Sequence, residues 1–129
     1  MIVLDASAAV EWLLQTPTGL KVERRIFEDG QLHAPHLLEV EVVQVLRRSV
    51  ARGAMPAHRA EDALLALGDL ALMRHSHDEM LWRIWELREN LTAYDATYVA
   101  LAELLNSPLV TCDGKVASAP GHHARIEVI

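Results

Sequence analysis

The chain alternates between two patterns of apolar and polar residues. Short apolar runs predict buried strands, whereas apolar residues recurring three and four positions apart predict helices with one buried face. The predicted strands are residues 1–4, 32–34, 70–74, 109–111 and 125–129. The predicted helices are residues 7–15, 19–29, 36–52, 56–68, 78–90, 92–105 and 113–119. Since strands and helices alternate, we expect a three-layer α/β/α fold with a largely parallel central sheet of four to five strands.

The predicted helix at residues 78–90 carries large apolar side chains that can face a core, although core and interface are not distinguished by the pattern. They are Met80, Leu81, Ile84, Trp85 and Leu87. The tryptophans also lie at helical spacing among apolar residues, which favours packing in a core or an interface over stacking on bases. They are Trp12, Trp82 and Trp85.

The composition indicates one domain spanning residues 1–129, because 51% of the residues are hydrophobic and can fill a single core. A formal net charge of −6 argues against broad electrostatic capture of nucleic acid and leaves room only for a local basic patch. The single cysteine, Cys112, excludes an internal disulfide, and no basic segment precedes the first apolar run. We expect a cytoplasmic protein with no membrane span, because charged residues or histidine interrupt every apolar run.

Four acidic residues fall at predicted strand ends or inside apolar helices: Asp5, Glu41, Asp95 and Asp113. Functional groups gather at the carboxyl ends of parallel strands, and two of these acids directly follow a strand. Crowded carboxylates repel one another, so a cluster of four would need a divalent cation. The pattern indicates metal-assisted phosphodiester chemistry.

Each acid also has a purely structural interpretation. The two acids at strand ends could serve only as helix N-caps. Thr92 and Asp95 have the spacing of a capping box, although the apolar surroundings of Asp95 mean that its carboxylate needs a partner. Glu39 and Glu41 lie on nearly opposite sides of one helix, and the periodicity leaves open which of them reaches a site.

Several segments together resemble the PIN-domain ribonucleases and, within them, the VapC-type toxins of bacterial toxin–antitoxin pairs. They occur in family order and at family spacing over essentially the full length: VLDAS (3–7), HAPHLLEVEV (33–42) running on to LRR (46–48), DATYVALAE (95–103) and LVTCD (109–113). Gly114 and Lys115 depart from the family pattern, since many relatives carry Arg or Glu there.

The resemblance implies an active-site quartet of Asp5, Glu41, Asp95 and Asp113. It selects Glu41 over Glu39, because the family's acid lies five residues before the leucine that precedes the paired basic residues. It further implies a catalytic hydroxyl group from Thr111, two residues before the last acid, and offers Ser7 as a second hydroxyl, which would bind substrate.

Hard oxygen ligands suit Mg²⁺, with Mn²⁺ as an alternative. Asp5 and Asp95 would bind the first ion. Asp113 and Glu41 would complete the outer shell of that ion, help to place a second ion when substrate arrives, or orient the attacking water. Arg47 and Arg48 could hold the RNA backbone, although a solvated helix face explains them equally well.

The implied function is endoribonuclease action that inhibits translation and growth, with neutralisation by a VapB-type antitoxin and formation of homodimers. A catalytically silent PIN-like binding module and a receiver-type signalling module are the alternatives. The receiver design needs two adjacent acids after the first strand, whereas Ala6 follows Asp5. The histidines lack further ligands at structural zinc spacing, and no base accompanies Cys112.

Overall fold

The computed structural model describes residues 1–129 and is built around one sheet. Its strands are β1 (Ile2–Leu4), β2 (Leu32–Pro35), β3 (Leu72–His75), β4 (Leu109–Thr111) and β5 (Ile126–Val128). They lie in the order β3-β2-β1-β4-β5, and every neighbouring pair is parallel. The predicted parallel sheet is therefore confirmed.

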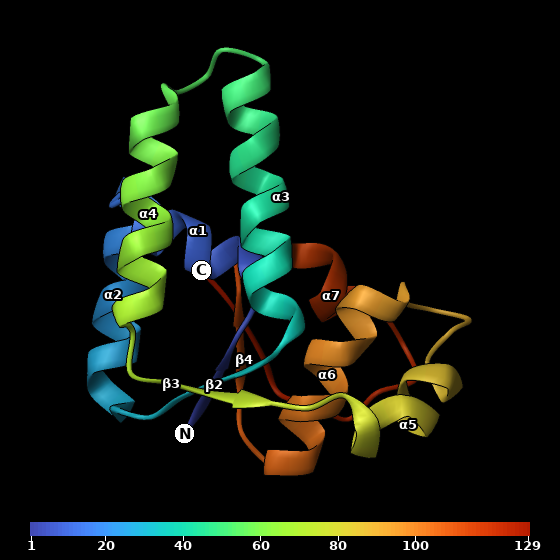
Figure 1. Ribbon diagram of the computed structural model, residues 1–129. Coiled ribbons are helices and arrows are strands. Elements are labelled where there is room, and N and C mark those ends of the chain that lie inside the picture. The colour runs from blue at the N-terminus through green and yellow to red at the C-terminus, as the bar shows by residue number, and fades with distance from the viewer.

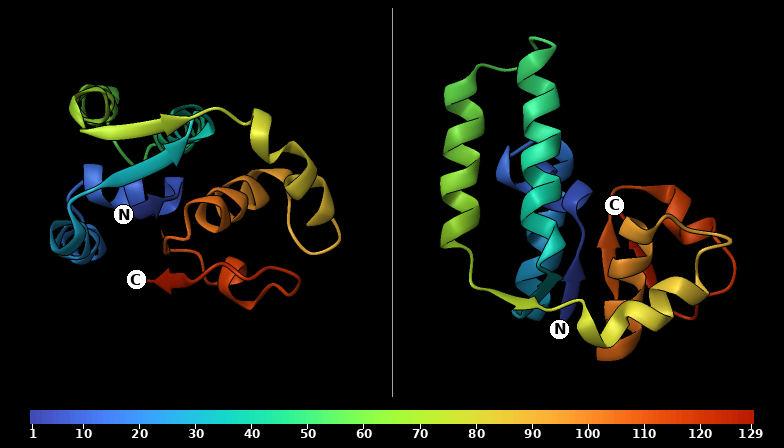
Figure 2. Two further views of the ribbon diagram at one scale, coloured as in Figure 1. Left: turned by 90° about the horizontal axis from the view of Figure 1, so that it is seen from below. Right: turned by 45° about the vertical axis from the view of Figure 1, so that its right-hand side comes forward.

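Helices cover both faces of the sheet. They are α1 (Ala6–Leu13), α2 (Pro17–Asp29), α3 (Leu37–Ala51), α4 (Ala57–Asp69), the 3₁₀ turn η1 (Asp78–Met80), α5 (Leu81–Glu86), α6 (Ala93–Leu105) and α7 (Gly114–Ser118). The pair α3 and α4 stands side by side and extends beyond the sheet (Figure 1). Helices α1 and α2 lie on one side of the sheet, and α5 and α6 lie on the other (Figure 2), which confirms the three layers. None of the helices combines the length and apolarity needed to cross a lipid bilayer.

The two central strands lie in a dry core. Every residue of β1 and β4 is buried, as parallel strands covered on both faces require. Helix α6 packs on β1 and β2 and buries every residue from Ala96 to Ala102. The polar groups of β1 and β4 are therefore confined to the strand ends, where the chain enters the next helix.

The helix predicted at residues 78–90 is shorter than expected. It begins as a 3₁₀ turn, and α5 ends at Glu86. The backbone N–H of Leu87 donates to the carbonyls of both Arg83 and Ile84, at 3.2 Å each. Such sharing tightens the last turn, and the chain leaves the helix there.

Only some of the five apolar side chains that could face a core reach it. Met80 and Leu87 are buried, but Leu81 and Trp85 are 58% and 59% exposed. Trp82 is 80% exposed and also lies outside the core. A six-residue helix has fewer than two turns, so it can bury only a narrow stripe.

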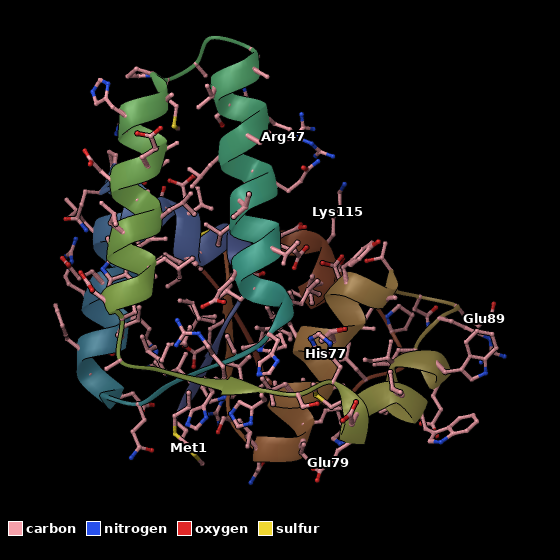
Figure 3. The ribbon with its side chains drawn as sticks, viewed as in Figure 1. Met1, Arg47, His77, Glu79, Glu89 and Lys115 are labelled. Atoms are coloured by element: carbon pink, nitrogen blue, oxygen red, sulfur yellow. The ribbon has the colours of Figure 1, made fainter.

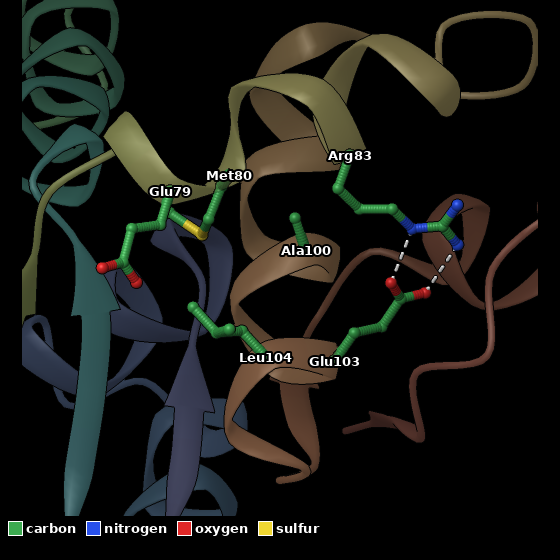
Figure 4. Close-up of a pocket in the computed structure, with 6 residues that line it drawn as sticks. All are labelled: Glu79, Met80, Arg83, Ala100, Glu103 and Leu104. Atoms are coloured by element: carbon green, nitrogen blue, oxygen red, sulfur yellow. Dashed lines mark hydrogen bonds and ion pairs between the residues drawn. The ribbon is translucent and has the colours of Figure 1, made fainter.

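An ion pair fixes α5 to α6. The Nε and Nη2 atoms of Arg83 donate to the two carboxylate oxygens of Glu103 over 2.7 and 3.0 Å (Figure 4). The side chain of Glu103 is only 6% exposed, and such bidentate pairing is the strong form of this interaction. A cavity of about 250 Å³ opens beside the pair, and Glu79 and Leu104 help to line it. Arg83 also donates to the carbonyl of Gly121, which ties down the loop that leads to β5.

The corner between α1 and α2 depends on a glycine. The N–H of Gly19 donates to Oγ1 of Thr16, the N-cap of α2, over 2.9 Å. A Cβ atom on Gly19 would lie 1.9 Å from the carbonyl oxygen of Glu11. The two helices can approach this closely only because the position has no side chain.

We expect Gly19→Ala to lower the free energy of unfolding by ~1–3 kcal/mol or more, because the new methyl group meets rigid backbone. The matched control is Gly68→Ala in α4, where a Cβ meets nothing within 4 Å and the loss of backbone freedom in the unfolded chain should stabilise the protein slightly. Urea unfolding followed by circular dichroism measures both. Equal stability of the two variants would contradict the close approach of α1 and α2.

Candidate active site

The parallel sheet delivers two acids to neighbouring positions. Asp5 directly follows β1 and caps α1, accepting a hydrogen bond from the N–H of Ala8 at 3.0 Å. Asp113 follows β4 by two positions and caps α7 through the N–H of Lys115 at 2.9 Å. Because β1 and β4 are adjacent and parallel, their carboxyl ends lie side by side. Asp5 and Asp113 therefore each cap a helix and also lie near a common site.

Two helices add the other acids. Asp95 lies in the first turn of α6, where its N–H donates to Oγ1 of the N-cap Thr92 at 3.2 Å. Glu41 lies on α3. All four acids line one cavity of about 190 Å³, together with Ala6, Ser7, Val45 and Tyr98. The predicted clustering of acids that are distant in sequence is thus present in the structure.

Hydroxyl groups hold the carboxylate of Asp5 in place. Ser7 Oγ donates to Oδ1 over 2.6 Å, and Thr111 Oγ1 donates to Oδ2. The two hydroxyls are themselves anchored, because the N–H of Cys112 donates to Ser7 Oγ and the N–H of Asp113 donates to Thr111 Oγ1, each at 2.9 Å. Both hydroxyl residues that the sequence indicated therefore contact Asp5 directly.

The structure also separates the two glutamates of α3. Glu39 points away from the cavity and forms an ion pair with Arg74 on β3, with Nε and Oε1 2.5 Å apart. Glu41 faces the cavity, where the hydroxyl of Tyr98 donates to its Oε1 over 2.6 Å. Tyr98 is only 3% exposed. Sequence reasoning missed it, although it lies three residues after Asp95 and thus on the same side of α6.

Burial and neighbouring negative charges raise the pKa of three of the acids. Burial raises the pKa of Asp5 above its ordinary value, and the charge of Asp95 adds to this increase. Burial likewise raises the pKa of Glu41, with further contributions from Asp95 and Asp5. Burial and the charge of Asp113 raise the pKa of Asp95, whereas the nearby cation of Lys115 lowers it. Ionising the whole cluster is therefore costly without a compensating positive charge.

The donor set suits a hard divalent cation. All four groups around the cavity offer carboxylate oxygens, the ligands that Mg²⁺ and Mn²⁺ prefer. No three Asp, Glu, His or Cys side chains converge as a ready-made set of ligands. This spacing fits an ion that keeps several water ligands and takes only one or two carboxylates directly.

The basic residues divide between two surfaces. Arg48 lines a groove that also includes Glu41, so it lies next to the acidic cavity. Arg47 lines a different groove, between α3 and α4, and its Nε donates to Gln44. The exposed Lys115, which rises from α7 beside α3 (Figure 3), was not among the predicted substrate contacts. The only indication of Lys115 in the sequence was its departure from the family pattern, in which many relatives carry Arg or Glu.

A pair of histidines and the single cysteine do not line the cavity of the four acids. Nδ1 of His33 and Nε2 of His75 are 2.9 Å apart and share a hydrogen bond across β2 and β3. Burial raises the pKa of the Cys112 thiol to about 11, which keeps it protonated near neutral pH and therefore weakly nucleophilic.

Comparison with known proteins places this geometry in a family. The family model described as PIN domain matches residues 2–121. Ribonuclease VapC12 of Mycobacterium tuberculosis is 42% identical over 129 residues, which cover 100% of this chain and 99% of that protein. VapC ribonuclease Mb0985 of Mycobacterium bovis is 40% identical over 129 residues, covering 100% and 98% of the two chains.

Solved structures have the same fold. PAE2754 from Pyrobaculum aerophilum superposes with a TM-score of 0.70 at 26% identity, covering 98% of this chain and 83% of that one. VapBC2 from Rickettsia felis, solved bound to a DNA fragment from its promoter, gives a TM-score of 0.73 at 15% identity, with 99% and 98% covered. Since the family model and the relatives of 40% identity or more extend over nearly the whole sequence, the chain belongs to the PIN-domain family and, within it, to the VapC group.

Proposed function

We propose that the chain is a metal-dependent endoribonuclease and the toxin of a VapBC-type toxin–antitoxin pair. The observation that carries the proposal is the single cavity lined by Asp5, Glu41, Asp95 and Asp113, which come from separate parts of the fold. The ribonuclease activity in the names of the relatives supports RNA as the substrate. Cleavage of cellular RNA would then inhibit translation and growth.

Three acids would hold the cation, one or two of them directly and the rest through its water ligands: Asp5, Asp95 and Asp113. Bound Mg²⁺ or Mn²⁺ supplies positive charge for the phosphate in the transition state and makes the attacking water more acidic. Ser7 and Thr111 keep the Asp5 carboxylate in one orientation through their hydrogen bonds. Such preorganisation avoids the cost of reorienting the group during the reaction.

Glu41 and the nearby cations would act on the substrate. Glu41, held by Tyr98, would orient the attacking water and accept its proton. Arg48 and Lys115 are exposed close to the cavity and would contact the phosphates that flank the bond to be cut. Arg47 lines the α3–α4 groove and donates to Gln44, so it would contribute less.

The proposed partners follow from the relatives. A VapB-type antitoxin would neutralise the toxin, in keeping with the VapBC assembly among the structural neighbours. We further propose that residues 1–129 act as one domain, that the chain forms homodimers and that it works in the cytoplasm. The exposed Leu81, Trp82 and Trp85 offer apolar surface for contacts with other chains.

We expect Asp95→Asn to reduce RNA cleavage in Mg²⁺ by roughly 100-fold or more while the fold stays intact, because it removes a negative charge that would hold the cation at the reacting phosphate. Asp5→Asn should act in the same direction. The control is Glu39→Gln, which changes a carboxylate of α3 that faces away from the cavity. Single-turnover cleavage measures all three, and wild-type rates in both aspartate variants would defeat the proposal.

Loss of the Tyr98 hydroxyl should weaken catalysis while all four acids remain in the cavity. We expect Tyr98→Phe to lower kcat by about tenfold, the low end for removing a group that orients a functional side chain. Thr97→Val is the matched control, since it removes another largely buried hydroxyl of α6, one that donates to the carbonyl of Ala93. If both variants lose the same small amount of activity, Tyr98 does not position Glu41.

In the metal-free protein, the contribution of the acidic cluster to stability should fall as pH rises. The raised pKa values of Asp5, Glu41 and Asp95 mean that the folded state binds protons more tightly than the unfolded chain. The stability linked to these groups is present below their unfolded pKa values and is lost as pH rises through the folded ones. A cation that binds the ionised acids should therefore raise Tm more at about pH 7 than at about pH 5. Differential scanning fluorimetry with Mg²⁺ tests this, and an equal gain at both pH values would argue against binding at the acids.

A further inference from the structure

A groove between α3 and the start of α6 opens directly beside the acidic cavity. Its volume is about 450 Å³. Glu41 and Val45 line both the groove and the cavity, so the two form one continuous depression. Whatever chain places a phosphodiester among the acids must therefore pass beside this groove.

The lining of the groove combines an aromatic face, aliphatic walls and a cation. Tyr94 lies at its edge and is 61% exposed, and Val40 on α3 is 69% exposed. Arg48 is exposed and forms no ion pair within the chain. The Oε1 atom of Gln44 accepts from Arg47, which leaves the amide N–H groups of Gln44 free to donate.

These groups match an unpaired nucleotide. A nucleobase has two apolar faces, which stack on aromatic side chains, and a polar edge, which takes hydrogen bonds from amides. The adjoining phosphate needs a cation. Since the chain has a net charge of −6, general electrostatic attraction supplies little of the affinity for RNA, and stacking gains in importance.

We propose that this groove is a base-binding subsite, in which a nucleotide next to the scissile phosphate stacks on Tyr94 while Arg48 contacts its phosphate. The inference rests on the proposed ribonuclease function and adds a determinant of sequence preference to it. A single-stranded substrate follows, because a paired base could not turn into the groove.

The test begins with a random pool of single-stranded RNA, cut by the purified full-length protein in Mg²⁺ and sequenced at the new ends. Wild-type protein should show a base preference at one position flanking the cut. Tyr94→Ala should lose that preference and about tenfold of kcat/KM on one preferred oligonucleotide. Tyr94→Phe, which keeps the ring, should restore both. Phe27→Ala removes an aromatic side chain on α2 that is 73% exposed and should cut as wild type does.

An abasic oligonucleotide separates stacking from a general effect on the fold. Removing the base at the preferred position should slow wild-type cleavage by a similar factor and leave Tyr94→Ala unaffected. The proposal is overturned if the abasic penalty is the same in both proteins. It is also overturned if Tyr94→Ala cuts normally but changes the molar mass in light scattering, since the groove would then serve a second copy of the chain.

Failure of the underlying function would look different. Wild-type protein that cuts no RNA, or that cuts equally well after Asp95→Asn, removes the ribonuclease proposal and the subsite with it. Normal cleavage that depends on Asp95 but not on Tyr94 removes the subsite alone.

Discussion

The parallel pairing of β1 with β4 in the dry centre of the sheet determines where the chemistry can occur. Val3 pairs with Leu109 and Leu4 with Val110, so the next residues of both strands emerge together. The N–H of Asp5 still donates to the carbonyl of Val110, and this places its carboxylate within reach of the Thr111 hydroxyl. A shift of the register by one residue would break this contact, because side chains alternate between the two faces of a strand.

The same arrangement makes the acidic cluster tolerable in the folded protein. Asp5 and Asp113 cap helices, and Asp95 lies in the first turn of α6. Backbone amides at helix N-termini favour negative charge, which offsets part of the repulsion among the acids. Capping and metal binding are therefore compatible uses of one carboxylate. The residual repulsion is what a divalent cation would remove.

Helix α6 connects the acids to the surface beside them. Tyr94 and Tyr98 are four residues apart and lie on one side of the helix. The buried tyrosine donates to Glu41, and the exposed one borders the groove that leads to the same glutamate. A single helix face thus carries a side chain that orients an acid and, in the proposal, one that selects the base next to the cut.

The local sequence determined the elements and the acids that end strands. Short apolar runs predicted the five strands and helical spacing predicted the helices, because these patterns reflect interactions within a few residues. They also placed Asp5 and Asp113 correctly after β1 and β4. The same reasoning overestimated the length of the helix at residues 78–90, which ends at Glu86. The position of this segment depends on the pairing of Arg83 with Glu103, a residue distant in sequence.

Only the tertiary structure decided which side chains meet. The residues alone left Glu39 and Glu41 open, and family resemblance rather than periodicity favoured Glu41. The rotation of α3 against the sheet turns Glu39 toward Arg74 and Glu41 toward Tyr98. The same rotation places Arg47 along the groove between α3 and α4 and Arg48 beside the acidic cavity. A helical pattern fixes the relative directions of side chains within one helix, but the direction in space comes from packing against elements far away in the chain.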